Sequence, residues 1–477
     1  MPFTRSISII LFVVFLILAI AAPEGHVYFS QDTFWLTALL SLILLFMSFL
    51  RNLFLDIIVL LTDSFYIQRF FVLFYFPEEI EKNEYTITLI RDNFYDAISF
   101  IIIAELSILL GYVIYQFFWN PSLRFSEDNH DISVFKKGGM FSSFFYYYAI
   151  IFIPLLLWQY IRILVFGVGI TGINIDQSWG IIVRLTSLFN SLWFLAIIAL
   201  LVKDTDKKNK LLAFLIITLF CGLNILTTSK GFFIVLIFLF IIIYYFINHN
   251  IPSKFIIYGF IATIFIATIY FNAIQIMRSV LINYYETSLF QIKMEWFKIS
   301  FIENLLKFSE RTGGLDWLVA FIAAGRDAFP SYVGLVGELK GIIDSFFPNT
   351  FFPGGLLGTK NNIPISKLIP IILKDQTMYY IIGSGDNLSF MGMTYLYFGH
   401  VYSIIFISLW SLLTFIVMFS KANLIIKILY FYIFVFSFFV GGLINTSVRS
   451  FYESILVYFI FYMLAKYRNH KLNYAGY

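Results

Sequence analysis

Basic side chains are the residues of this chain whose types and positions could do chemistry. Several of them interrupt or border strongly apolar runs: Arg69, Arg162, Arg184, Lys230, Arg278 and Arg449. A charged residue inside a membrane span costs about 2.5–3.5 kcal/mol on insertion scales, so it tends to mark a ligand path. Arginine also stays charged in an apolar site and binds phosphate oxygens through two parallel hydrogen bonds. The set therefore favours a site for an anionic phosphate group.

Each of these cations also has a simpler interpretation. An arginine inside a span can extend along the helix to the lipid headgroups or pair with a neighbouring side chain. Arg449, for example, has Glu453 one helical turn further along the chain, a spacing that suits a salt bridge within a helix. Taken singly, any one arginine fits this interpretation as well as the functional one, whereas the whole set favours the anion site.

Proton transfer would need a side chain that accepts a proton. The candidates are Asp316, Asp327, Glu338, Asp386 and His400, of which Asp316, Glu338 and His400 are favoured. Two further arginines, Arg311 and Arg326, accompany the carboxylates in the same stretch. The alternative for each charge in this stretch is a solvated surface group. For His400, the alternative is an interfacial histidine that is hydrogen-bonded to a backbone carbonyl.

Membrane spans are the elements that must position these residues. Of the 477 residues, 60% are hydrophobic and only 13% are charged, against about a quarter in an average soluble domain. Long apolar runs predict an all-α polytopic integral membrane protein with about twelve transmembrane helices. The predicted spans are 7–22, 33–50, 53–76, 94–118, 141–166, 179–202, 211–229, 231–248, 255–275, 396–419, 424–445 and 448–465.

Lysine and arginine concentrate in alternate connections between the spans, and this bias predicts the orientation. With the N-terminus inside, the inner connections hold clusters such as Lys207, Lys208 and Lys210, whereas the outer short connections hold few basic residues. An even number of spans then places both termini in the cytoplasm. We divide the chain accordingly into spans one to nine (1–275), a long extracytoplasmic loop (276–389), and the last three spans with a cytoplasmic tail (390–477).

The loop 276–389 is predicted to contain short amphipathic helices. Glycine and proline punctuate it, and connections of this length are usually functional. The stretch around Trp317 predicts a helix that lies on the membrane surface or dips into it, with one face on membrane or protein and the other toward substrate. The loop is too apolar to form a soluble domain of its own.

Composition also excludes several classes of function. A net charge of +4 is too small to indicate nucleic acid, and the single Cys221 excludes internal disulfides and cysteine-based zinc sites. No cluster of metal ligands is evident, which predicts chemistry without a metal or other cofactor. The absence of a Walker A sequence, of HExxH and of Gly-x-Ser-x-Gly disfavours ATP-driven transport, zinc proteolysis and serine hydrolase chemistry.

Three stretches resemble the Wzy-type O-antigen and capsular polysaccharide polymerases of bacteria, a family related to the O-antigen ligases. LTTSKGFFIVLIF (226–238) is similar to a Ser-Arg-Gly element at the outer start of a span, with Lys230 in place of the arginine. ERTGGLDWLVAF (310–321), followed by IIDSFFPNTFFPGG, resembles the loop before the late spans, with Pro348-Asn349 where a Pro-Arg pair is common. NLSFMGMTYLYFGHVYS (387–403) is similar to the start of the next span, with Met393 where an acidic residue is usual.

The resemblance implies a membrane glycosyltransferase whose active site faces the periplasm from the bacterial inner (cytoplasmic) membrane. Such an enzyme transfers a growing glycan from undecaprenyl diphosphate onto a hydroxyl of the next lipid-linked repeat unit. The partners implied are an undecaprenyl-diphosphate-linked oligosaccharide and the lipid bilayer, with a chain-length regulator and a flippase acting beside it.

The resemblance also suggests roles for the candidate residues. Arg278, Arg311 and Lys230 would stabilise the leaving diphosphate, because its developing charge needs fixed cations. Asp316, Glu338 or His400 would serve as the general base. Substrate would be bound by a second set of residues, the last two by stacking on sugar rings: Arg326, Arg449, Arg162, Arg184, Trp317 and Tyr332.

Three other functions fit the same sequence. A lipid-linked oligosaccharide flippase can also have about twelve spans, but such carriers usually show repeated halves and evenly short loops, and no repeat is detectable here. An O-antigen ligase would use the same lipid-linked chemistry. A non-catalytic membrane assembly factor would leave the outward-facing cations unexplained.

Overall fold

The structure is a computed structural model, and every regular element in the residues that it describes is a helix. Those residues are 2–21, 26–81, 89–119, 140–166, 189–190, 192–202, 205–226, 232–248, 314–346, 354–359, 362, 368, 372–373, 390–420, 423–437 and 444–475. The predicted span 255–275 lies outside them, as do the first ten residues of the predicted span 179–202.

Eight of the described helices match predicted spans. They are α1 (Pro2–Ile20), α2 (Gln31–Phe49), α6 (Arg91–Trp119), α8 (Met140–Phe166), α10 (Phe194–Leu201), α11 (Lys207–Leu226), α12 (Phe232–Asn248) and α23 (Ile444–Ala475). Their ends lie within about five residues of the predicted ones, except that α10 begins at Phe194, after the predicted start at 179, and α23 ends at Ala475, after the predicted end at 465. The predicted span 53–76 consists of three consecutive segments, α3 (Leu53–Thr62), the π-helical η1 (Asp63–Ile67) and α4 (Gln68–Tyr75). The predicted span 424–445 begins with α21 (Leu424–Tyr430) and the π-helical η6 (Phe431–Ser437).

Six helical stretches among the described residues are long and apolar enough to cross a membrane. They are Gln31–Phe49, Leu53–Tyr75, Arg91–Trp119, Phe141–Ile161, Phe390–Phe419 and Ser447–Tyr467. By length and composition, the described part of the chain is therefore all-helical and has the character of a multi-pass membrane protein. The full count of about twelve spans, and the orientation of the chain, stay predictions.

The contacts divide the chain into two compact units that do not follow the order of the sequence. Unit 1 contains Met1–Arg124, Leu305–Ser420 and Ile433–Arg449, and unit 2 contains the remainder. The described part of the predicted loop 276–389 thus belongs to the same unit as the first four predicted spans. That loop segment contributes the helices α16 (Gly314–Ala324), η4 (Arg326–Ala328) and α17 (Leu335–Phe346).

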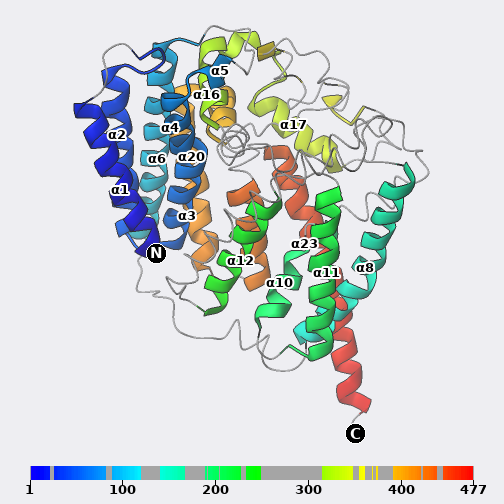
Figure 1. Cartoon of the computed structure of the whole chain (residues 1–477). Coiled ribbons are helices and arrows are strands. Elements are labelled where there is room, and N and C mark those ends of the chain that lie inside the picture. The colour runs from blue at the N-terminus through cyan, green and yellow to red at the C-terminus, as the bar shows by residue number, and fades with distance from the viewer. Residues whose placement is uncertain are drawn as a thin grey trace, which may run out of the picture. The chain divides into compact units, whose positions relative to one another are not determined.

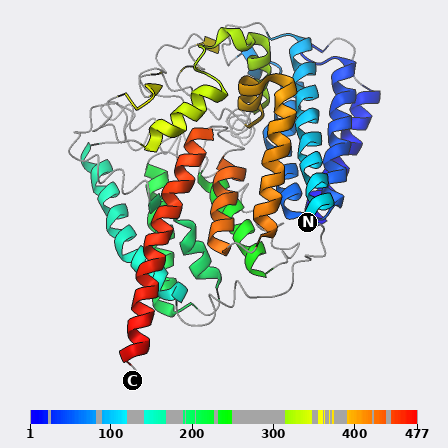
Figure 2. The same cartoon turned by 180° about the vertical axis from the view of Figure 1, so that it is seen from behind.

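Unit 1 is a bundle of roughly aligned helices, and α16 lies across the end where α4 finishes (Figures 1 and 2). Helices α6 and α20 (Phe390–Phe419) approach each other closely, because small residues line their contact. A Cβ atom on Gly111 would lie 2.6 Å from the backbone oxygen of Ser408. The Ser411 hydroxyl donates a hydrogen bond of 2.9 Å to the carbonyl of Ile108. Small residues with a hydroxyl in contact are a typical way to join membrane helices.

Helix α20 breaks at Gly399, whose backbone has φ 64° and ψ −162°. The segment 390–398 is therefore a short helix of its own, and the longer helix restarts at His400. The predicted span 396–419 began too late because Gly392 and Thr394 interrupt the hydrophobic run, although Phe390 and Met391 are fully buried. A positive φ at this position favours glycine.

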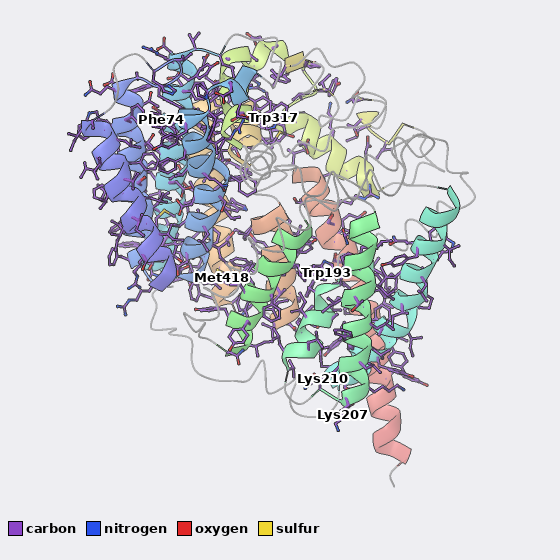
Figure 3. All side chains as sticks on the ribbon, in the orientation of Figure 1. Phe74, Trp193, Lys207, Lys210, Trp317 and Met418 are labelled. Atoms are coloured by element: carbon purple, nitrogen blue, oxygen red, sulfur yellow. The ribbon has the colours of Figure 1, made fainter. Side chains whose placement is uncertain are left out.

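Within unit 2, hydrogen bonds from side chains to backbone join neighbouring elements. The hydroxyl of Tyr160 on α8 donates to the carbonyl of Leu219 on α11 at 2.6 Å. The hydroxyl of Tyr148, also on α8, donates to the backbone carbonyl of Phe189 at 3.1 Å. Lys207 and Lys210 lie at the N-terminal end of α11 (Figure 3). That end is one of the basic clusters that predict a cytoplasmic connection.

The predicted orientation can be tested with single cysteines placed in a Cys221→Ser background. Asp327 is exposed in η4, and Lys208 is exposed at the start of α11. We expect an impermeant maleimide to label Asp327→Cys in intact spheroplasts, and to label Lys208→Cys only after the membrane is permeabilised. The opposite pattern would reverse the orientation and place the loop 276–389 in the cytoplasm.

Candidate functional site

The centre of the candidate site is a buried ion pair between Arg69 on α4 and Asp316 on α16. Arg69 Nε donates to Asp316 Oδ1 at 2.9 Å, and Arg69 Nη2 donates to Asp316 Oδ2 at 2.6 Å. The side chains are 0% and 5% exposed. Two parallel hydrogen bonds between a guanidinium and a carboxylate give the strongest and most directional form of such a pair. The pair therefore fixes α16 to α4.

Local sequence explains how each partner reaches this position. Arg69 follows the π-helical segment η1 and stands next to Phe70, whose ring lies 4.3 Å from that of Phe29 between centroids. Asp316 stands in the first turn of α16, where the helix dipole and the unpaired backbone N–H groups favour a negative charge. Both charges are thus held by helices whose apolar neighbours are buried.

Helix α16 is buried on all sides over its first two turns, and this corrects the expectation of an amphipathic surface helix. All residues from Gly314 to Phe321 are buried, and α16 contacts η1, α4, α6 and α20. Trp317 is only 5% exposed and lies within the packed end of unit 1 (Figure 3). A stacking role for Trp317 on a sugar ring would require this helix to move.

Glu338 is the second buried carboxylate of the segment. It stands in the first turn of α17 and accepts a hydrogen bond of 2.7 Å from the hydroxyl of Tyr397, on the short helix 390–398. Glu338 is 8% exposed and Tyr397 is 3% exposed. The expectation of a solvated surface charge therefore fails for Glu338, as it does for Asp316. The same short helix precedes His400, which is exposed and packs its ring edge against Phe100 and Tyr395.

The connection between α16 and α17 presents a cation and an aromatic ring to the outside of unit 1. Arg326 is exposed and Tyr332 is partly exposed. Phe329 is buried and packs edge-on against Phe321 of α16, and the N–H of Val333 donates to the carbonyl of Pro330 at 2.8 Å. The connection is therefore folded onto α16, and it holds these two side chains at a defined place.

Sequence reasoning missed the role of Asp344, which is fully buried near the end of α17. Its carboxylate accepts hydrogen bonds from the N–H of Leu357 at 2.6 Å and from the N–H and hydroxyl of Thr359 at 2.8 and 2.6 Å. Gly355 has a φ of 87°, and a Cβ there would lie 2.3 Å from Asp344 Oδ2. The Pro-Gly-Gly sequence was the only signal of this tight turn, and nothing nearby indicated the aspartate at its centre.

The structure brings together only part of the predicted set. Asp316 and Glu338 both contact elements of one bundle, and Arg449 is partly exposed near the start of α23. The placement of the other predicted cations lies outside the described residues: Arg184, Lys230, Arg278, Arg311 and the side chain of Arg162. Within the described residues, no group of three His, Cys, Asp or Glu side chains could hold a metal ion.

Comparison with known proteins adds no relative. The chain matches no protein-family model, and no curated protein or solved structure is significantly similar to it. The candidate site is therefore defined by its own geometry: a loop segment fixed into a helical bundle by one buried ion pair and one buried carboxylate–tyrosine hydrogen bond.

Breaking the ion pair should destabilise the protein strongly. Arg69→Met leaves Asp316 buried without its cation, and removal of one partner of a buried pair costs about 3–5 kcal/mol. We expect a clear fall in the melting temperature of the detergent-purified protein. The double variant Arg69→Met/Asp316→Leu should recover most of the loss, because apolar replacement of both partners is often neutral.

Arg326→Ala is the matched control for this measurement, since it removes an exposed arginine of the same segment. Its effect should stay within about 0.5 kcal/mol. Equal melting temperatures for Arg69→Met and Arg326→Ala would show that the ion pair does not hold α16 in place.

Proposed function

We propose that the protein is a membrane glycosyltransferase that polymerises lipid-linked oligosaccharide repeat units into a surface polysaccharide. The observation that carries the proposal is that the long segment before the last spans is fixed into the membrane bundle. Arg69 holds α16 and Tyr397 holds α17, and the connection between these helices exposes Arg326 and Tyr332. This arrangement suits a substrate with an anionic diphosphate and a sugar chain.

A lipid-linked substrate explains why such a site would be built at the end of a membrane bundle. The undecaprenyl tail stays in the bilayer, while the diphosphate and the glycan project from it. A cation at the end of the bundle can bind the diphosphate, and an aromatic side chain beside it can contact a sugar ring. Arg326 and Tyr332 are the described residues whose exposure fits these two tasks, with Arg449 as a further cation for the same substrate.

Glu338 is the described residue best suited to act as the general base. Its carboxylate is shielded from solvent and is oriented by the Tyr397 hydroxyl at 2.7 Å. Asp316, by contrast, accepts hydrogen bonds from Arg69 through both of its oxygens. In this proposal its role is therefore to position α16. His400 is exposed beside the break at Gly399 and remains a second candidate base.

In the proposed reaction one glycosidic bond forms, one bond to the diphosphate breaks, and one proton is transferred to the base. The acceptor hydroxyl of the next repeat unit gives its proton to the base and attacks the sugar carbon that bears the lipid diphosphate. The bond from this carbon to the diphosphate breaks, and the diphosphate leaves with the electron pair. Fixed cations stabilise the charge that develops on it, a task for which Lys230, Arg278 and Arg311 are proposed from their sequence positions.

Glu338→Gln tests the proposed base while keeping the size of the side chain. Loss of a general base lowers a rate by about 10²- to 10⁴-fold, so the polysaccharide of a deletion strain complemented with this variant should collapse to a single capped repeat unit on a gel. Tyr397→Phe should retain shortened chains, because it removes only the hydrogen bond that orients the carboxylate.

Lys340→Gln is the control, since it changes an exposed charge two residues from Glu338 on the same helix. It should give the wild-type ladder at equal protein abundance. A full ladder from Glu338→Gln would exclude this residue as the base. In the deletion strain itself, full-length polymer left on its lipid would indicate a ligase, and repeat units trapped in the cytoplasm would indicate a flippase.

A further inference from the structure

Two carboxylates lie near the middle of neighbouring candidate spans, and the proposed reaction uses neither of them. Asp63 begins the π-helical segment η1 within the stretch Leu53–Tyr75, and Glu105 stands on α6 within Arg91–Trp119. Glu105 is 0% exposed. Thr62, the residue directly before Asp63, is in hydrogen-bond contact with Glu105, so the two carboxylates stand on adjoining segments. Acidic residues at this depth are rare and tend to mark ion or proton pathways.

The described residues satisfy these carboxylates only in part. The hydroxyl of Thr62 donates to Glu105 Oε1 at 2.5 Å. The second oxygen of Glu105 and both oxygens of Asp63 are shielded from solvent and have no hydrogen-bond partner among the described residues. Three buried acceptor atoms without a partner are unfavourable, because a buried polar group that lacks a hydrogen bond keeps the full cost of its desolvation.

No basic side chain of the described bundle is ion-paired with these two carboxylates. Arg69 is the nearest arginine along the chain, roughly 9 Å further along the helix at 1.5 Å per residue, and both oxygens of Asp316 occupy it. The other charged or imidazole side chains on α6 itself and on the helices that pack against η1 or α6 are Arg91, Asp92, Asp96, Asp32, Asp56, Asp316 and His400. Arg91 begins α6, roughly 21 Å along the helix from Glu105 at 1.5 Å per residue. The described side chains therefore supply no ion-pair partner to these two carboxylates, and a bound cation would compensate their charge.

The local backbone also singles out this position. A π-helical segment places one residue more per turn than an α-helix does, and such segments occur frequently at functional sites because they turn a side chain away from its regular position. Here the segment begins at Asp63 and is followed directly by Gln68 and Arg69. Together these features build a site of oxygen atoms between η1 and α6.

We propose that Asp63, Glu105 and Thr62 form an intramembrane binding site for a monovalent cation, either a proton or a sodium ion. Carboxylate and hydroxyl oxygens suit both of these ions. A divalent cation is disfavoured, because Mg²⁺ and Ca²⁺ require about six or more oxygen ligands, and the described residues supply these three side chains. A bound cation would affect the position of Arg69, because η1 continues directly into α4, the helix that carries Arg69.

The test uses the full-length protein in lipid nanodiscs and treats the two ions as separate arms. For a proton, infrared difference spectra should show the carbonyl stretch of a protonated carboxyl group, and this band should disappear in Glu105→Gln or Asp63→Asn. For sodium, NaCl should raise the melting temperature of the wild type at fixed pH, and choline chloride at the same ionic strength should not. The sodium response should then be lost in both variants.

Asp327→Asn is the control, because it removes an exposed carboxylate of the same unit and should leave both responses unchanged. Thr62→Val provides a second probe that keeps both carboxyl groups: it should shift the frequency of the protonated band or weaken the sodium response. A wild type that shows neither a variant-sensitive carboxyl band nor a sodium-specific shift would overturn the proposal.

Discussion

The ion pair between Arg69 and Asp316 is the interaction on which the arrangement of unit 1 depends. It joins a span near the N-terminus to a helix 247 residues later in the chain, and both partners are almost completely buried. Desolvation of two charges is expensive, and good geometry is needed to offset it. The bidentate contact supplies that geometry, and it holds α16 against α4, η1, α6 and α20.

Several other features follow from this anchoring. With α16 fixed, the connection that carries Arg326 and Tyr332 starts from a rigid point, and Phe329 folds it back onto the helix. Helix α17 then reaches the short helix 390–398, where Tyr397 meets Glu338. The turn around Asp344 closes the far end of α17. A segment that was predicted as an extracytoplasmic loop is thereby integrated with the membrane bundle over its described length.

The candidate spans that the structure describes could be predicted from sequence, because hydrophobicity over twenty residues is a strong signal. The prediction 33–50 agrees closely with α2, and 94–118 agrees with α6. The burial of α16 was not predicted, although its sequence GLDWLVAFIAA is apolar on all sides apart from Asp316, which is typical of a buried helix. The flanking charges and glycines at 310–314 instead favoured an amphipathic surface helix.

Other features left no signal in a single sequence. Arg69 stands out in the sequence as a charge inside an apolar run, but nothing in its neighbourhood identifies a partner that is so distant in the chain. The π-helical segment at Asp63 and the positive φ at Gly399 are set by tertiary packing, because the same residues could continue a regular helix. Residues whose placement depends on long-range contacts can be proposed from sequence as candidates, but their partners must come from the structure.

The separation of Arg69 and Asp316 has a consequence for biogenesis. Arginine 69 leaves the ribosome long before the residue that neutralises it has been made. At about 5–20 residues per second, synthesis of the intervening 247 residues takes roughly 12–50 s. Throughout that interval the first spans carry an arginine without its final partner. They can therefore reach their final packing only later. The ion pair, and with it the packing of α16 against α4, can form only after α16 has been synthesised.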